Sequence, residues 1–337
     1  MRCSWSPLRK TLPTLEHVLT LSDDVGIVQH AAGRVPDTST GYCTDDVARA
    51  LIVMLMRLQR VPSDPDAERL AHIYLTFLRD AQLADGRFHN FMSYERAWLD
   101  DVGTHDSCGR AIWSLGYTVR FAPRDVWRDA AAVMLDRAVA SVDWLEYPRA
   151  RAYAMLGLAH AQRTLPLRRL AHELAARYER ERASDWDWFE PVMTYDNARL
   201  PEALLRAGAA LQEDRLLAIG AATLGFLERV VFEDGIFVPI GNRGWFPRGG
   251  PRARFAQQPL EAAAMLDAEL AAFDASGNRA HLDAAANAAA WYDGKNLLGA
   301  SMAVRGGCYD GLEADGPNRN MGAESTLAFL AAAYAQE

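Results

Sequence analysis

The chain has 337 residues, of which 36 are Lys or Arg and 44 are Asp or Glu, so its formal net charge is −8. Half of the residues are hydrophobic and 24% are charged, which excludes a disordered chain and is ordinary for a globular protein. The acidic balance and the lack of a long basic stretch argue against nucleic acid as a partner. No window approaches 18 consecutive apolar residues, so no membrane-spanning helix is predicted.

The N-terminal segment and the cysteines predict a cytoplasmic protein. Residues 1–21 include basic side chains but no continuous apolar run and no small-residue cleavage site, so a secretory signal is not expected. The cysteines are widely spaced and form no CxxC pair, which favours reduced thiols. They are Cys3, Cys43, Cys108 and Cys308.

Apolar residues recur at i, i+3, i+4 and i+7 along most of the chain, which predicts a helical protein. Five of the predicted helices have a charged face and are expected to contact solvent, and residues 12–21 supply a sixth. The five span Glu68–Gln82, Val126–Val142, Leu165–Arg182, Arg215–Phe232 and Arg279–Asn296.

Six further helical segments carry less charge and more alanine, and they form a degenerate repeat. They begin near Asp45, Ser107, Pro148, Asp196, Gln258 and Gly322. Small residues allow close helix contacts, so these six are expected to form an inner ring and the charged helices an outer ring. This pattern predicts an all-α (α/α)6 toroid, as one domain over residues 1–337 with a short N-terminal extension at about 1–11. The repeat alone also fits an open helical solenoid.

The starts of the inner helices carry the unusual chemistry. Polar residues there can cap free N–H groups, and Pro148 and Pro259 suit a first helical turn. The loops before these starts are long and rich in Trp, Tyr, Asp, Asn, His and Gly, whereas the loops at the opposite ends are shorter. Because function usually resides on loops held by a rigid scaffold, the site is expected at this end of the barrel.

Superposition of the six starts predicts a ring of charged side chains just inside the mouth of the barrel. One explanation of such an Arg–carboxylate network is that its buried charges only neutralise one another. Apolar residues would close a barrel at a lower cost in free energy, so we interpret the ring as functional. The ring comprises Arg49, Arg110, Arg151, Arg199, Glu261 and Glu324, with Asp45, Asp46, Asp106 and Asp196 just outside it.

Two stretches combine acids with aromatics, at residues 88–116 and 185–205. In the second, Glu190 lies beside Trp188, where an apolar environment would raise the carboxyl pKa as a general acid requires. Asp106 and Glu190 are therefore the leading acid/base candidates, with Asp46 and Asp196 next, since glycosidic cleavage needs two carboxyl groups.

Aromatic side chains interleave with the acids, a combination that suits the apolar faces and the hydroxyl groups of sugars. The predicted partner is an oligosaccharide, with no nucleic acid and no membrane, and the oligomeric state is not predicted. The expected substrate-binding residues are Asp45, Arg49, Tyr42, Trp98, His105, Arg110, Arg151, Trp188, Tyr195, Asn197, Arg199, Trp245, Gln258, Glu261, Tyr309, Asp310 and Glu324.

No cofactor and no metal ion are predicted. Three DDV tripeptides, beginning at Asp23, Asp45 and Asp100, offer paired aspartates for Mg²⁺ or Ca²⁺, but capping and loop hydrogen bonds explain them better. The histidines show no HExxH or similar pair, so catalytic zinc is not expected. RGGPRAR near Arg248 does not lie between a strand and a helix, as a phosphate-binding loop requires.

The chain resembles the six-hairpin glycosidase superfamily, whose (α/α)6 barrels have the active site at the N-terminal ends of the inner helices. The helix count, the inner-helix starts and the acid–aromatic loops carry the resemblance over roughly residues 12–335. More narrowly, the motifs are similar to a bacterial group associated with glycosyltransferases and glycan metabolism. The motifs are SDDVGIVQHA, GYCTDDVARALI, DSCGRAIWSLG, WFEPVMTYDNARLPEALL, QPLEAAA and GAESTLAFL.

Our first prediction is a glycoside hydrolase, or a phosphorylase whose arginines hold phosphate, acting on a bacterial oligosaccharide. A sugar epimerase or isomerase would need a base that removes a carbon-bound proton. The candidate base is His105, because it lies in a dense acid–aromatic loop. A non-catalytic glycan-binding or assembly module would need the aromatic side chains but no carboxyl group with a shifted pKa. A terpene-cyclase-like enzyme using aspartates and Mg²⁺ would need a more apolar pocket.

Overall fold

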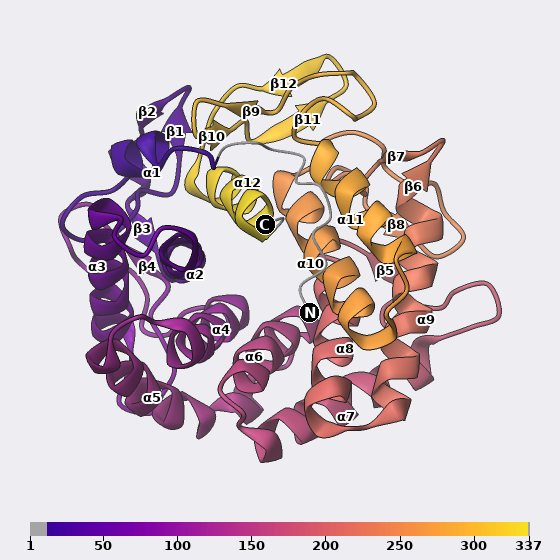
Figure 1. Cartoon of the computed structure of the whole chain (residues 1–337), viewed down its shortest axis with the longest axis horizontal. Helices are drawn as coiled ribbons and strands as arrows, with labels where there is room; N and C mark the ends of the chain where they lie inside the picture. Colours follow the sequence, from indigo (N-terminus) through magenta and orange to yellow (C-terminus); the bar gives the residue numbers. More distant parts are fainter. Residues whose placement is uncertain (1–11, 336–337) are drawn as a thin grey trace.

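The computed structural model describes residues 12–335, which form two concentric rings of helices (Figure 1). This confirms the predicted all-α (α/α)6 barrel. The N-terminal extension predicted at about residues 1–11 lies outside the described residues, as does Cys3. Cys43, Cys108 and Cys308 are buried, and their reduced state stays a prediction.

Six helices surround the centre of Figure 1 and form the inner ring. Each packs against the inner helices before and after it, and α12 packs against α2, which closes the ring. The inner helices are α2 (Thr44–Arg60), α4 (His105–Phe121), α6 (Pro148–His160), α8 (Arg199–Leu211), α10 (Pro259–Ser276) and α12 (Ala323–Ala335). Their starts match the predicted repeat to within three residues.

The outer ring consists of helices that each pack on an inner neighbour. They are α1 (Glu16–Leu21), α3 (Pro65–Ala81), α5 (Asp125–Val139), α7 (Thr164–Glu181), α9 (Asp214–Val231) and α11 (Ala280–Ala290). Two differ from the sequence prediction in length. The first begins at Glu16 rather than Leu12, and α11 ends six residues before the predicted Asn296, where the chain turns into a loop.

The two ends of the barrel differ in their connections. At the C-terminal ends of the inner helices, at most four residues lead to the next outer helix, for example 212–213 and 61–64. At the N-terminal ends, which we call the mouth, the loops are long, as predicted, except for the short loop 140–147 before α6.

Short antiparallel ladders and two 3-10 turns give the mouth loops their shape. The ladders β3–β4 and β5–β8 each join two successive mouth loops, whereas the other four are local hairpins. The strands are β1 (Ala31–Ala32), β2 (Val35–Pro36), β3 (Tyr42–Cys43), β4 (Phe91–Met92), β5 (Val192–Met193), β6 (Phe232–Glu233), β7 (Ile236–Phe237), β8 (Phe246–Pro247), β9 (Ala303–Val304), β10 (Gly307–Cys308), β11 (Gly311–Glu313) and β12 (Gly316–Asn318). The turns are η1 (Thr38–Thr40) and η2 (Val142–Trp144).

Small residues bring α4 and α6 into close contact. A Cβ on Gly116 would overlap the carbonyl oxygen of Gly157, and a Cβ on Gly157 would overlap that of Ile112. Glycine is therefore required at both positions for the helices to approach this closely. Side-chain capping is seen at α4, where Thr104 Oγ1 accepts from the Ser107 N–H (3.1 Å).

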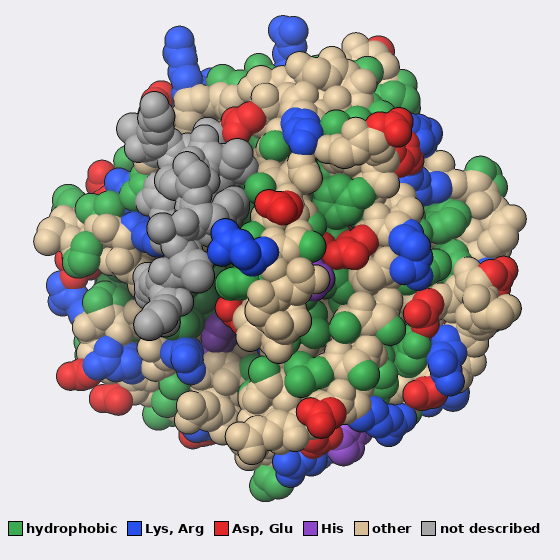
Figure 2. Space-filling model, turned by 45° about the vertical axis from the view of Figure 1, so that its right-hand side comes forward, with side chains coloured by type: hydrophobic (Ala, Val, Ile, Leu, Met, Phe, Trp, Pro, Cys, Tyr) green, Lys and Arg blue, Asp and Glu red, His purple; other side chains and the backbone are tan. Residues whose placement is uncertain are grey.

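Among the described residues, no helix is both long and apolar enough to cross a membrane. On the face in Figure 2, Lys and Arg side chains alternate with Asp and Glu rather than gathering by sign. The cytoplasmic location inferred from the sequence stays a prediction.

Candidate active site

A cavity of about 330 Å³ opens at the mouth between α2, α4 and α12. This volume lies within the usual range of small-molecule sites. Seven residues predicted from the sequence line it: Asp45, Asp46, Arg49, Arg110, Gln258, Asp310 and Glu324. We call it the mouth cavity.

Arg49 joins two carboxylates in this cavity that come from different helices. Its Nη1 donates to Asp46 Oδ1 (2.8 Å) and its Nη2 to Glu324 Oε2 (2.7 Å). Asp46 is buried, whereas the Glu324 side chain is 37% exposed. Burial raises the pKa of Asp46 to about 6, although the charge of Arg49 opposes the shift. The cavity therefore holds two carboxyl groups in unlike environments.

Arg110 connects the mouth cavity to the lumen of the barrel. Its side chain is buried and donates to Asp45 Oδ1 (2.7 Å) and to Tyr153 Oη (2.7 Å), and it lies 3.5 Å from Asp196 Oδ2. Tyr153 donates in turn to the same oxygen of Asp196 (2.5 Å). The α2, α4, α6 and α8 helices thus share one charged network.

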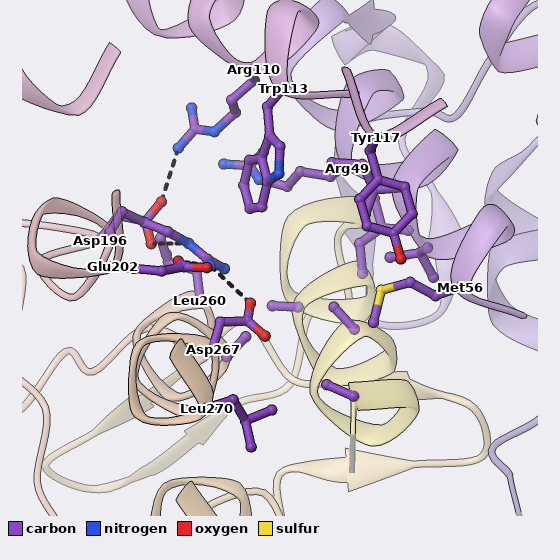
Figure 3. Close-up of a pocket in the computed structure, with 18 of the residues that line it drawn as sticks. Arg49, Met56, Arg110, Trp113, Tyr117, Asp196, Glu202, Leu260, Asp267 and Leu270 are labelled. Atoms are coloured by element: carbon purple, nitrogen blue, oxygen red, sulfur yellow. Dashed lines mark hydrogen bonds and ion pairs between the residues drawn. The ribbon is translucent and has the colours of Figure 1, made fainter. Parts of the chain in front are cut away.

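A second cavity of about 220 Å³ lies below this network, and we call it the lumen cavity (Figure 3). Arg199 pairs there with Glu202 (2.6 Å) and Asp267 (2.8 Å). Trp113 and Tyr117 of α4 line the cavity with apolar side chains such as Met56 and Leu260. The lumen cavity therefore combines charged side chains with an apolar lining.

Several buried polar atoms of the network have no hydrogen-bond partner among the described residues. They are Arg110 Nε, and Asp196 Oδ1 and Arg199 Nε, which form an ion pair at 3.5 Å without a hydrogen bond; all three residues line the lumen cavity. Buried polar groups without partners are uncommon, because each costs free energy. Hydroxyl groups of a ligand, or water, would satisfy them.

Asp196 is held in a backbone conformation that non-glycine residues seldom adopt, with φ = 49°. Its N–H donates to the buried carboxylate of Glu261, and the Asn197 N–H donates to the same group (3.4 Å). Burial and the charge of Asp196 raise the pKa of Glu261 to about 8. Glu261 therefore fixes the loop that presents Asp196 and lines neither cavity.

Glu190 also supports this loop rather than reaching the cavities. The buried Arg149 donates to Glu190 Oε2 (2.6 Å), to the Tyr195 carbonyl oxygen and to Asn197 Oδ1 (3.2 Å). Glu190 lines neither the mouth cavity nor the lumen cavity. The structure thus gives Glu190 and Asn197 a positioning contact through Arg149, a residue that the sequence prediction missed.

Asp106 lies at the start of α4, close to the network. Tyr195 donates to Asp106 Oδ2 (2.6 Å), and Arg110 Nη1 is 3.8 Å away. The rings of Tyr195 and Trp245 lie 6.3 Å apart. Asp106 is therefore hydrogen-bonded beside the mouth cavity but is not part of its lining.

Ten of the predicted substrate-binding residues line neither cavity, and they include Tyr195, Asn197, Trp245 and Glu261, described above. Tyr42 and Trp188 are buried in the core, where they cannot contact a sugar. Arg151 points outward and pairs with Glu173 of α7 (3.1 Å). His105 stacks on Trp144, Trp98 stacks on His89, and Tyr309 packs against the core.

Other cavity residues were not predicted from the sequence. Gln29, His30, Phe91 and Ser325 line the mouth cavity, and Trp113 and Tyr117 line the lumen cavity. Gln29 and His30 lie within the motif SDDVGIVQHA, so the motif itself was a signal. Trp113 likewise lies within the motif DSCGRAIWSLG, whereas Tyr117 gave no such signal, because an aromatic in a helix usually packs in the core.

Comparison with known proteins supports the fold and leaves the activity open. No protein-family profile matches the chain, and no curated protein matches it. The structure of cellobiose 2-epimerase from Bacillus thermoamylovorans B4167 matches with a TM-score of 0.73 at 12% identity over 96% of each chain. A D-mannose isomerase matches with a TM-score of 0.67 at 12% identity over 96% of this chain and 95% of that one.

A GH76 α-mannanase from Bacteroides thetaiotaomicron matches with a TM-score of 0.65 at 11% identity, over 95% of this chain and 93% of that one. The chain therefore has the (α/α)6 barrel fold that these sugar-processing enzymes share, as predicted. At these identities the likeness concerns the fold, and function must be argued from the site. The narrower resemblance to a glycosyltransferase-associated group stays a prediction.

Proposed function

We propose that this chain is a carbohydrate-active enzyme that cleaves a glycosidic bond in an oligosaccharide by carboxylate acid and base catalysis. The observation that carries the proposal is the contact of Arg49 with both Asp46 and Glu324 in the mouth cavity. Glycosidic cleavage needs two carboxyl groups in different environments, since one must donate a proton and the other must act as a base or nucleophile.

In this mechanism Asp46 is the general acid. Its pKa of about 6 lets it carry a proton in weakly acidic solution and donate it to the glycosidic oxygen as the C–O bond breaks. Glu324, the more exposed partner, accepts a proton from the attacking water or attacks the sugar carbon itself. Arg49 keeps both carboxyl groups at one end of the cavity, and Asp106 and Asp196 orient the network beside them.

Substrate binding follows from the same lining. Arg110, Asp45 and Gln258 offer donors and acceptors for sugar hydroxyls, and Phe91 offers an apolar face. Arg110 Nε has no hydrogen-bond partner among the described residues, and Asp196 Oδ1 and Arg199 Nε form an ion pair at 3.5 Å without a hydrogen bond, so these atoms can take further hydrogen bonds towards the lumen. A substrate that reaches from the mouth towards the lumen would satisfy these groups.

The test is product release from a panel of bacterial oligosaccharides, followed by chromatography with and without inorganic phosphate. Free sugar without phosphate is expected, and the anomer formed first gives the stereochemistry. Asp46→Asn and Glu324→Gln are each expected to lower kcat by roughly 10²–10⁴-fold with an unchanged circular dichroism spectrum. Glu313→Gln, at a carboxylate that pairs with Arg243 on the surface, is the matched control and should keep full activity.

Three results would redirect the proposal. Full activity in both variants would overturn the assignment of Asp46 and Glu324. Sugar phosphate formed only in the presence of phosphate would identify a phosphorylase. Binding of a glycan without any product would identify a non-catalytic glycan module.

A sugar epimerase or isomerase is the second candidate, and one observation favours it. His30 and Asp310 both line the mouth cavity, so an imidazole that can act as the base for a carbon-bound proton lies in the cavity. Reaction in D₂O separates the two functions. An epimerase incorporates deuterium at carbon without releasing new reducing ends and loses activity in His30→Gln, whereas a hydrolase releases reducing ends and tolerates that change.

A further inference from the structure

We propose that Glu228, Glu269 and His281 form a binding site for a divalent transition-metal ion of the zinc type. The three residues come from α9, α10 and α11, and their potential ligand atoms all lie within 4.8 Å of one another. His281 Nδ1 is 2.6 Å from Glu269 Oε2 and 3.6 Å from Glu228 Oε1. This inference does not depend on the proposed function.

The charge balance of the cluster is the first argument for a bound cation. Glu269 is completely buried, and its Oε1 has no hydrogen-bond partner among the described residues. Among other buried carboxylates, Asp46 faces Arg49, Glu202 faces Arg199, and Glu261 accepts two backbone N–H groups. Within the described part of the chain, neither Glu269 nor Glu228 has an Arg or Lys within 4 Å. A buried carboxyl group without such a partner is neutralised by a bound cation, by a proton of its own or by protonated His281, and a metal ion can neutralise both glutamates at once.

The donor set is the second argument and selects the kind of ion. Two carboxylate oxygens with one imidazole nitrogen suit Zn²⁺ and other first-row divalent transition-metal ions, whereas Mg²⁺ and Ca²⁺ prefer ligands that are all oxygen atoms. The side chains of Glu228 and His281 are 32% and 21% exposed, so an ion has access from solvent and water can complete a four-coordinate shell. Small side-chain movements would draw the three ligands around the ion.

The position of the cluster indicates a structural role. None of the three residues lines the mouth cavity or the lumen cavity. An ion bound there would link two outer helices to the inner α10, and a site that exists only in the folded chain stabilises that chain.

A proton is the competing occupant. Burial and the charge of Glu228 raise the pKa of Glu269 well above its ordinary value, so without a metal ion this carboxyl retains a proton. Glutamine reproduces the shape of the protonated acid but cannot serve as a charged ligand. Glu269→Gln therefore separates the two occupants.

The experiment uses the full chain without an affinity tag, stripped with EDTA and passed into chelator-free buffer. Its thermal midpoint is measured with Zn²⁺, Co²⁺, Mg²⁺ or Ca²⁺, and calorimetric titration gives the stoichiometry. Zn²⁺ is expected to bind one to one and to raise Tm by about 4 °C at a hundredfold excess over Kd. Mg²⁺ and Ca²⁺ are expected to leave Tm unchanged, and bound Co²⁺ should give the visible absorption of a four-coordinate site.

Variants assign the effect to the cluster. Glu269→Gln and His281→Gln should lose the Zn²⁺-dependent rise in Tm, and Glu228→Gln, at a more exposed position, tests the site if the other two fail to fold. His172→Gln is the matched control, because His172 contacts Glu213 (2.6 Å) in an exposed pair that Arg168 already neutralises. The absence of any rise with Zn²⁺, or an equal rise in the wild type and all three cluster variants, would overturn the proposal.

Discussion

The mouth of the barrel and the contact between α4 and α6 belong to the same ring of helices but use opposite chemistry. At the contact, Gly116 and Gly157 bring two backbones together with no polar side chain between them. At the mouth, Arg49, Arg110 and Arg199 hold buried carboxylates, and several buried polar atoms have no hydrogen-bond partner among the described residues. Buried ion pairs are often less favourable than apolar packing, so their presence at one end indicates function there rather than stability.

The largest expected change in stability concerns Arg149, which supports the mouth without lining a cavity. In Arg149→Gln, Glu190 and the acceptors on Tyr195 and Asn197 lose their shared donor in a largely buried environment. We expect the free energy of unfolding to fall by about 3–5 kcal/mol, since breaking a buried pair leaves an uncompensated charge. Urea denaturation measures this loss. A loss below about 1 kcal/mol would show that the loop does not depend on this contact.

The wall of the barrel is tested by Gly157→Ala. A methyl group there would overlap the backbone of α4, so we expect a loss of about 1–3 kcal/mol in the free energy of unfolding. Gly225→Ala is the matched control in α9, because its Cβ would approach only the Arg229 and Glu228 side chains, at 3.7 Å or more. The control should be neutral or stabilising by up to about 1 kcal/mol, as alanine favours helices. Equal effects of both changes would contradict close packing as the reason for Gly157.

The pH dependence of stability tests the burial of Asp46. Its folded pKa of about 6 lies above the ordinary value of 3.8, so its contribution is present at low pH and is lost as the pH rises through 6. Between pH 5 and pH 7.5 this amounts to about 1 kcal/mol. Asp46→Asn remains neutral and should lose less stability than the wild type over this interval, as measured by urea denaturation. A parallel decline in the two proteins would contradict the raised pKa.

The smallest expected effect is that of Arg151→Gln. Arg151 lies two residues from Arg149 but points outward, and its partner Glu173 is 41% exposed. Exposed ion pairs contribute about 0–1 kcal/mol, so stability should change by less than 1 kcal/mol. Turnover with the substrate found in the panel should be unchanged. A severe loss of activity would restore Arg151 to the ring predicted from the sequence.

The pair Arg149 and Arg151 shows where sequence analysis reached its limit. Superposition of a degenerate repeat gives the helix start to within a few residues, but two residues correspond to roughly 200° around a helix. The alignment therefore chose the arginine on the opposite face. Glu190 illustrates the same limit for loops, because the sequence placed it beside aromatics and only the folded chain sets it against Arg149.

The sequence by itself determined the elements that depend on local chemistry. Periodicity, alanine content and loop composition predicted the two rings of helices, the end of the barrel with the long loops, and acids and arginines that line the mouth cavity. The tertiary structure decided which groups meet. Arg49 and Glu324 are 275 positions apart, and Glu228, Glu269 and His281 come from three helices. Closure of the ring sets such contacts, because it brings together side chains that no local pattern relates.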